Sequence, residues 1–154
     1  MVIVRLDTID RLENTLASSH FLSSNFETNI LVSEYSFFRN GLLEKLLDKN
    51  IRYSFQEDHD PILFRTKFLN QMARTVETPF VAVWDADVII PVGQVIKSVE
   101  LLRNREADFV YPYEKYALDT SPILRKFYLQ ENKIEFLEQN IKKMKEMSKK
   151  ETLQ

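Results

Sequence analysis

Residues 80–91, FVAVWDADVIIP, place an apolar run directly before two aspartates. Phe80 to Trp84 are consecutive apolar residues, a pattern typical of a strand buried on both faces in a parallel sheet covered by helices. Asp85 and Asp87 then fall at or just beyond the carboxyl end of this strand. Two carboxylates so close repel each other, so the pair stabilises little unless a positive group lies between them. The stretch predicts an α/β fold and leaves open what that positive group is.

Strand-like and helix-like segments alternate around this stretch. Strands are expected at 2–6, 29–35, 51–55, 80–84 and 108–113, and helices at 9–24, 41–48, 61–76 and 91–105. Asp60 is expected to cap the helix that Pro61 begins, and Pro79 to follow its end. Alternating units of this length predict a mostly parallel, right-handed sheet with helices on both faces.

The expected organisation is a single domain over residues 1–154, with an α/β core in 1–113 and a helical segment in 114–154. In that last segment, 119–129 reads as a helix. A stripe at 3-4-3 spacing follows, formed by Ile134, Leu137, Ile141 and Met144. The stripe predicts either a seam through which the chain forms homo-oligomers or an apolar face packed on its own sheet.

Composition and charge exclude several classes of function. The formal net charge of −2 argues against nucleic acid as the main partner, because no basic field would attract a polyanion. With no cysteine, disulfides and thiolate chemistry are excluded, and two histidines are too few for a His-rich zinc site. The two glycines allow neither a GxGxxG nor a GxxxxGK phosphate loop.

The chain contains no run of the ~20 apolar residues needed to cross a bilayer. Its first residues, MVIVRLD, are unlike a signal peptide because they form a short strand-like run with an early Arg and Asp. These features lead us to expect a cytoplasmic protein without a transmembrane segment.

An Asp-x-Asp at the carboxyl end of a strand is well placed to hold a divalent cation. Ligands in open α/β sheets bind beyond the carboxyl ends of the strands. Mg²⁺ and Mn²⁺ prefer oxygen ligands, and Mg²⁺ typically uses one or two carboxylates together with substrate phosphates. A cation on Asp85 and Asp87 would also stabilise a leaving diphosphate. The alternative is that Asp85 caps a turn and Asp87 is a solvated loop residue.

Further charged residues are expected at the same edge of the sheet. Arg65 and Lys67 lie near the start of the helix that precedes Phe80, where the helix dipole and both cations favour an anion. Arg5 closes the first predicted strand and Glu34 closes the second. Together they predict a crevice for an anionic substrate; for Arg65 and Lys67 the alternative is an ordinary solvated helix face.

The chain resembles the GT-A-type nucleotide-sugar glycosyltransferases. The resemblance rests on a first strand that ends in VRLD, the Glu that closes the second strand, FRTKFLN at 64–70 and FVAVWDADVIIP at 80–91. The Arg-x-Lys-x-Leu-Asn helix at 65–70 followed by Asp-x-Asp is similar to the β-1,4-galactosyltransferases and to bacterial family-two enzymes. The resemblance covers about Val2 to Tyr113. It implies a Rossmann-like fold that binds a nucleoside-diphosphate sugar, with a UDP-sugar favoured, for transfer to a saccharide acceptor.

The resemblance also implies roles for individual residues. Asp87 matches the carboxylate that ligates Mn²⁺ or Mg²⁺, and Asp85 matches the one near the donor ribose and the metal. Arg65 matches a donor-binding arginine, Arg5 occupies a position that contacts the nucleotide, and Glu34 occupies one near the base.

Two further positions follow the same resemblance. Asn70 matches the Asn of the helix motif, where we expect a structural role. Trp84 ends a buried strand and is expected to belong to the core.

The expected pattern of this family is incomplete in the chain. No glycine-rich acceptor segment and no late metal-binding His follow the fifth predicted strand, and the nearby acids Glu114 and Asp119 are interpreted as surface residues in place of a general base. The sequence therefore predicts the donor-binding half of an inverting enzyme, with no catalytic base identified.

Two alternatives stay open. One is a haloacid-dehalogenase-type phosphatase, with Asp85 as nucleophile and Asp87 as acid/base, although three strand–helix units precede this motif here. The other is a non-catalytic, degenerate transferase domain that acts through its helical tail.

Overall fold

The computed structural model describes residues 1–113 and 117–146 of the chain. It contains two compact units, Met1–Val88 and Ile89–Gln154. The predicted helical segment 114–154 is thus described only over 117–146, and the prediction of a single domain stays a prediction. Among the described residues, no helix is long and apolar enough to span a membrane.

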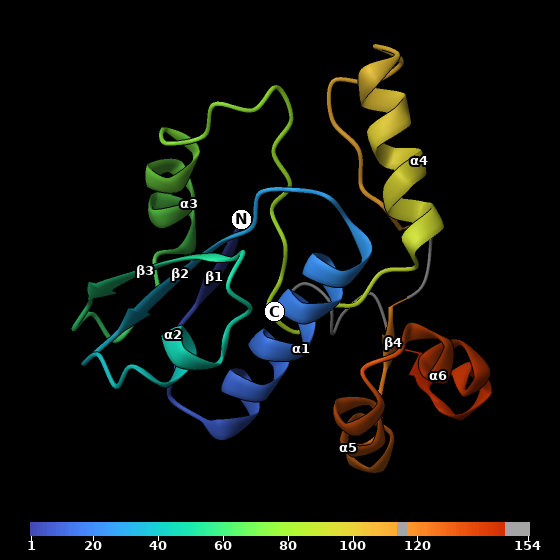
Figure 1. The fold of residues 1–154 in the computed structure, drawn as a ribbon, viewed down its shortest axis with the longest axis horizontal. Coiled ribbons are helices and arrows are strands. Elements are labelled where there is room, and N and C mark those ends of the chain that lie inside the picture. Colours follow the sequence, from blue (N-terminus) through green and yellow to red (C-terminus); the bar gives the residue numbers. More distant parts are fainter. Residues whose placement is uncertain (114–116, 147–154) are drawn as a thin grey trace. The chain divides into compact units, whose positions relative to one another are not determined.

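A parallel sheet organises the first unit (Figure 1). Within the described residues it contains β1 (Val2–Val4), β2 (Leu31–Ser36) and β3 (Arg52–Glu57), in the order β1-β2-β3. Val4 lies opposite Glu34, and Glu34 lies opposite Phe55. The predicted α/β class with a parallel sheet is confirmed.

Helices follow each strand of this unit, as the sequence predicts. α1 (Ile9–Asn25) begins after Thr8, whose side chain accepts a hydrogen bond from the Arg11 amide. α2 (Leu42–Leu46) begins after Gly41, whose φ of 74° suits a glycine, and α3 is Arg65–Ala73. In Figure 1, α3 lies above the strands, whereas α1 and α2 lie below them.

The core of the first unit lies between the sheet and these helices. On one face, Tyr35 of β2 stacks on Phe68 of α3 with ring centroids 3.7 Å apart, and Ile3 and Met72 join the same cluster. Because side chains alternate along a strand, Val32 points to the other face, where it is fully buried. Both faces of the sheet are therefore covered.

The predicted fourth strand, 80–84, is mostly wrong. Of these residues only Trp84 forms a sheet bridge, with Val2, and its amide donates to the Met1 carbonyl at 3.0 Å. This contact places the segment beside β1, on the edge that β2 does not occupy. Phe80, Val81 and Val83 are exposed within their unit, so the run is not buried on both faces. An apolar run indicates a tendency to be buried, but a strand also needs a partner strand along its length, and here only Trp84 has one.

The third helix begins four residues later than predicted. Asp60 does not cap it, because Phe64 precedes the helix and the Asp60 side chain instead accepts from the Ile62 amide at 3.0 Å. Arg5 Nη1 donates to the carbonyls of Asp60 and Pro61 at 2.8 and 3.4 Å. These bonds hold carbonyls that a helix would have used for its own first turn, so the segment stays a loop.

The second unit consists mainly of helices. Its elements are α4 (Val92–Arg103), β4 (Leu118–Asp119), α5 (Pro122–Glu131), α6 (Ile134–Gln139), the 3₁₀ turn Ile141–Lys143 and β5 (Lys145–Glu146). β4 and β5 pair antiparallel. The helices expected at 91–105 and 119–129 are confirmed as α4 and α5.

Two predictions for this unit are wrong. Residues 108–113 form no strand, and their alternate aromatic rings Phe109 and Tyr111 contact each other with centroids 5.2 Å apart. The 3-4-3 stripe does not lie on one helix, because α6 ends at Gln139 and a 3₁₀ turn follows. The Asn140 side chain donates back to the Phe136 carbonyl at 2.8 Å, which occupies a helix-terminal carbonyl at this point. The homo-oligomer through this stripe stays a prediction without a continuous helical seam.

Candidate functional site at the carboxyl edge of the sheet

The Asp-x-Asp sequence lies on a tight turn that is fixed to the core. The Val88 amide donates to the Asp85 carbonyl at 3.3 Å, which closes the turn. The indole Nε1 of Trp84 donates to the Val88 carbonyl at 2.8 Å. Trp84 itself is buried, and its ring lies 6.3 Å from that of Phe21 on α1. Trp84 is therefore a core residue, as predicted, and its polar edge also sets the position of the aspartates.

The positive group beside Asp85 is the guanidinium of Arg65. Arg65 is the first residue of α3, and its Nη2 forms an ion pair with Asp85 Oδ1. Both side chains stay about half exposed, at 46% for Arg65 and 49% for Asp85. Sequence analysis placed both residues in one crevice, and the structure brings these two together.

Asp87 lies on the same turn with its carboxylate exposed. It makes no hydrogen bond or ion pair with any residue that the structure describes. No group of three or more acidic or histidine side chains suited to a metal occurs among the described residues. Two carboxylates fit Mg²⁺ or Mn²⁺ only where a ligand such as a diphosphate supplies further oxygens.

Arg5 lies at the same edge, directly after β1, but its guanidinium is buried and fully engaged. Nη2 forms an ion pair with Asp58 at 2.5 Å, and Nε donates to the Tyr35 carbonyl at 3.2 Å. With the two carbonyl bonds already described, Arg5 ties the end of β1 to β2 and to the loop before α3. The Phe37 ring covers it, with the centroid 5.5 Å from Cζ.

Glu34 does not close its strand, because β2 continues for two residues beyond it. Its side chain is fully buried, and Oε2 accepts a hydrogen bond from the Tyr53 hydroxyl at 2.8 Å. Oε1 is buried without a partner among the described residues. Burial and the hydrogen bond to Glu34 both raise the pKa of Tyr53, so this phenol stays protonated and continues to donate. The structure thus places Glu34 inside the unit rather than on the open crevice.

Lys67 and Asn70 are both exposed on α3. Lys67 lies two residues after Arg65, and positions i and i+2 of a helix do not face each other. Its ammonium instead lies 5.4 Å from the Phe68 ring centroid. Of the two predicted cations of this helix, Arg65 is the one in contact with the Asp-x-Asp turn.

Sequence reasoning missed two residues of this edge, Asp58 and Phe37, which hold Arg5 from two sides. The signal for Asp58 was available, since QEDHDP follows a predicted strand with three acids. An ion pair across 53 positions of sequence, however, cannot be assigned from spacing alone.

Comparisons with protein-family models, with curated proteins and with solved structures find no match for this chain. The glycosyltransferase resemblance and the phosphatase and non-catalytic alternatives accordingly stay predictions.

Proposed function

We propose that the carboxyl edge of the sheet binds a nucleoside-diphosphate sugar together with Mn²⁺ or Mg²⁺, as the donor-binding part of a GT-A-type, galactosyltransferase-like inverting glycosyltransferase. The observation that carries the proposal is the Asp-x-Asp turn, in which Asp85 pairs with Arg65 and Asp87 has no partner among the residues that the structure describes. The resemblance favours a UDP-sugar as donor and a saccharide as acceptor.

Charge supports this assignment. Because Arg65 and Asp85 neutralise each other, Asp87 leaves the turn with one net negative charge, which disfavours a diphosphate. Asp85 and Asp87 would hold a divalent cation, which would make the net charge of the turn positive and leave Arg65 without its ion pair to Asp85. The freed guanidinium lies at the start of α3, where its fork and the helix dipole both suit phosphate oxygens.

In the proposed reaction this chain positions the donor and stabilises the departing diphosphate. The bound cation supplies Lewis-acid stabilisation of the leaving group. Arg65 adds charge-assisted hydrogen bonds, and Trp84 holds the turn in place through Val88. We assign no general base to the described residues.

Calorimetric titration of UDP into the protein tests the proposal, with Mn²⁺ and again with a chelator. We expect binding only with Mn²⁺, and loss of that binding in Asp87→Asn. Asp108→Asn is the matched control, because Asp108 is also exposed and its replacement changes the net charge equally. Equal binding by Asp87→Asn and the wild type would contradict the proposal, as would equal binding with and without Mn²⁺.

A further inference from the structure

A second polar cluster lies on the first unit, at the C-terminal end of α1 and beside the loop that precedes β3. His20 Nδ1 lies 3.2 Å from Asp48 Oδ2, and His20 Nε2 lies 3.4 Å from Ser24 Oγ. The two ring nitrogens of one histidine thus connect a carboxylate on one side to a hydroxyl on the other. This order of groups is the one by which a serine nucleophile is activated.

The local fold explains why these three residues meet. His20 and Ser24 are four residues apart on α1, so their side chains lie on the same face, one turn apart. Asp48 follows α2, which contacts α1, and is brought beside His20 by that packing. Ser23 donates to Asp48 at 2.5 Å, and this hydrogen bond lowers the pKa of Asp48. An ionised Asp48 is what orients a histidine and stabilises it once it is protonated.

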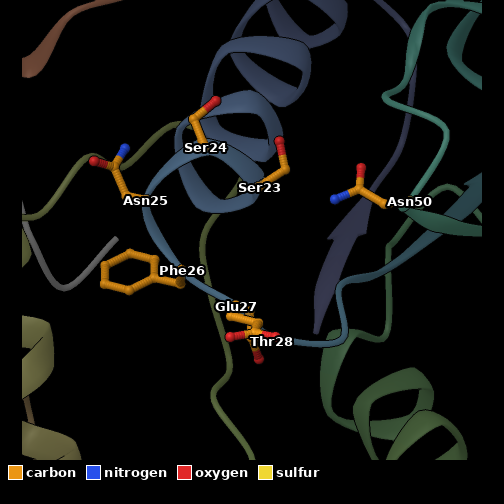
Figure 2. A pocket seen from close by; sticks show the side chains of 7 residues that line it. All are labelled: Ser23, Ser24, Asn25, Phe26, Glu27, Thr28 and Asn50. Carbon is orange, nitrogen blue, oxygen red and sulfur yellow. The ribbon is translucent and has the colours of Figure 1, made fainter.

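A pocket of about 400 Å³ opens at the hydroxyl end of this cluster (Figure 2). Ser24 lines it from α1, and Asn50 lines it from the loop before β3. Figure 2 shows the Asn50 amide group directed toward the end of α1. The Asn50 side chain makes no hydrogen bond with another described residue, so its NH₂ group is available to a ligand oxygen.

We propose that Ser24, His20 and Asp48 form a second, hydrolytic site that cleaves small, uncharged acyl esters. Ser24 Oγ bonds to the acyl carbon while its proton passes to His20 Nε2. The ester C–O bond then breaks, and His20 returns the proton to the departing alcohol. Water attacks the acyl-serine with His20 as base, which releases the acid and restores Ser24. Asn50 lines the same pocket as Ser24, and we assign its amide as the donor to the oxyanion of a substrate bound there.

The surroundings decide the class of ester. Glu27 lines the pocket, and α1 ends there with no basic residue in its last turn. The negative end of the helix dipole and this carboxylate both disfavour an anionic ester. His20 and Asp48 are well exposed, so water has access and the cluster gains little from a low dielectric. A small activated ester is therefore the expected substrate, with slow turnover.

Labelling with an uncharged fluorophosphonate, followed by peptide mass spectrometry, tests this site in the full chain. We expect the label on Ser24 and its loss in Ser24→Ala. Ser98→Ala is the control and should label as the wild type does, since Ser98 is a helix serine that only donates to the Gln94 carbonyl. An unlabelled wild type, a label on Ser23, or a label that persists in Ser24→Ala would each overturn the proposal.

Two variants separate activation from mere exposure of the hydroxyl. His20→Gln should slow labelling by about 100-fold, as expected for loss of a general base. Asp48 acts through His20 as a positioning residue, so Asp48→Asn should slow labelling and Asp48→Glu should recover part of the rate. Circular dichroism checks that each variant is folded. Labelling of a folded His20→Gln at the wild-type rate would contradict the proposal.

Discussion

Two arginine–aspartate pairs lie at the carboxyl edge of the same sheet, and they differ in burial. Arg5 and Asp58 are 7% and 15% exposed, whereas Arg65 and Asp85 are 46% and 49% exposed. Arg5 also donates to three carbonyls, from β2 and from the loop before α3. Among the described residues, the Arg65 side chain forms a hydrogen bond and ion pair with Asp85 alone.

This difference in burial distinguishes a pair that stabilises the fold from a pair that is suited to bind a ligand. A buried, fully bonded pair cannot be exchanged for a ligand without exposing an unpaired charge, so Arg5 and Asp58 serve the fold. An exposed pair contributes little to stability and can open at low cost, so Arg65 and Asp85 are suited to a ligand. Residue type alone does not make this distinction, because both pairs consist of the same two side chains.

Removal of Asp58 should have the largest effect. Asp58→Ala leaves Arg5 buried without its counter-ion, and we expect a loss of about 3–5 kcal/mol in the free energy of unfolding. Asp85→Ala is the matched control, with an expected loss of about 1 kcal/mol or less because the pair is exposed. Urea unfolding followed by circular dichroism measures both. Equal losses would remove the distinction between the pairs.

Replacement of Arg65 should affect the ligand rather than the fold. If the freed guanidinium binds the diphosphate, Arg65→Met should weaken Mn²⁺-dependent UDP binding by about 10- to 100-fold, the equivalent of one charged hydrogen bond. Arg103→Met, at the exposed end of α4, is the control for the change in net charge. Calorimetry gives both affinities, and an equal change in the two variants would indicate a general charge effect only.

The turn itself can be loosened through Trp84. Trp84→Phe keeps an aromatic ring against Phe21 but removes the donor to the Val88 carbonyl. We expect a loss of about 1 kcal/mol in the free energy of unfolding and weaker UDP binding, because the aspartates lose a fixed position. Thermal unfolding and calorimetry report the two effects. Unchanged UDP affinity would show that the turn needs no such support.

The smallest expected effect concerns stability in acid, through the hydrogen bond from Ser23 to Asp48 at the C-terminal end of α1. Because the folded-state pKa of Asp48 is lowered by Ser23, its contribution is present above the unfolded pKa. That contribution is lost as pH falls below about 4 and through the folded pKa. Ser23→Ala should therefore flatten the decline of unfolding free energy below about pH 4, and Ser98→Ala should not. Identical acid slopes for Ser23→Ala and wild type would contradict this assignment.

Local patterns predicted the elements that depend on local physics. The helical spacing of Ile9 to Ser24 corresponds to α1, and the strand-like run at 29–35 corresponds to β2. Both could be predicted because the apolar pattern that defines each element lies within the segment itself. The meeting of Arg65 and Asp85 was also predicted from the sequence, although the strand expected before Asp85 is reduced to one bridge between Trp84 and Val2.

Features that depend on distant partners were not predictable in the same way. The start of α3 was misplaced because Arg5 holds the carbonyls that a helix from Pro61 would have used. Glu34 looked like an edge residue, but Tyr53 on the neighbouring strand holds it inside. The strand at 108–113 was expected from its alternating aromatic residues, yet no described segment pairs with it.

The most direct test of the account is the electron paramagnetic resonance signal of Mn²⁺ with the protein, with UDP, and with both. The account predicts that the signal of free Mn²⁺ falls most when protein and UDP are both present, because two carboxylates and a diphosphate complete the site together. The signal should recover in Asp87→Asn but not in Asp108→Asn. The result that would contradict this prediction is additivity: with protein and UDP together, the signal of free Mn²⁺ falls by no more than the sum of the decreases measured with each of them alone.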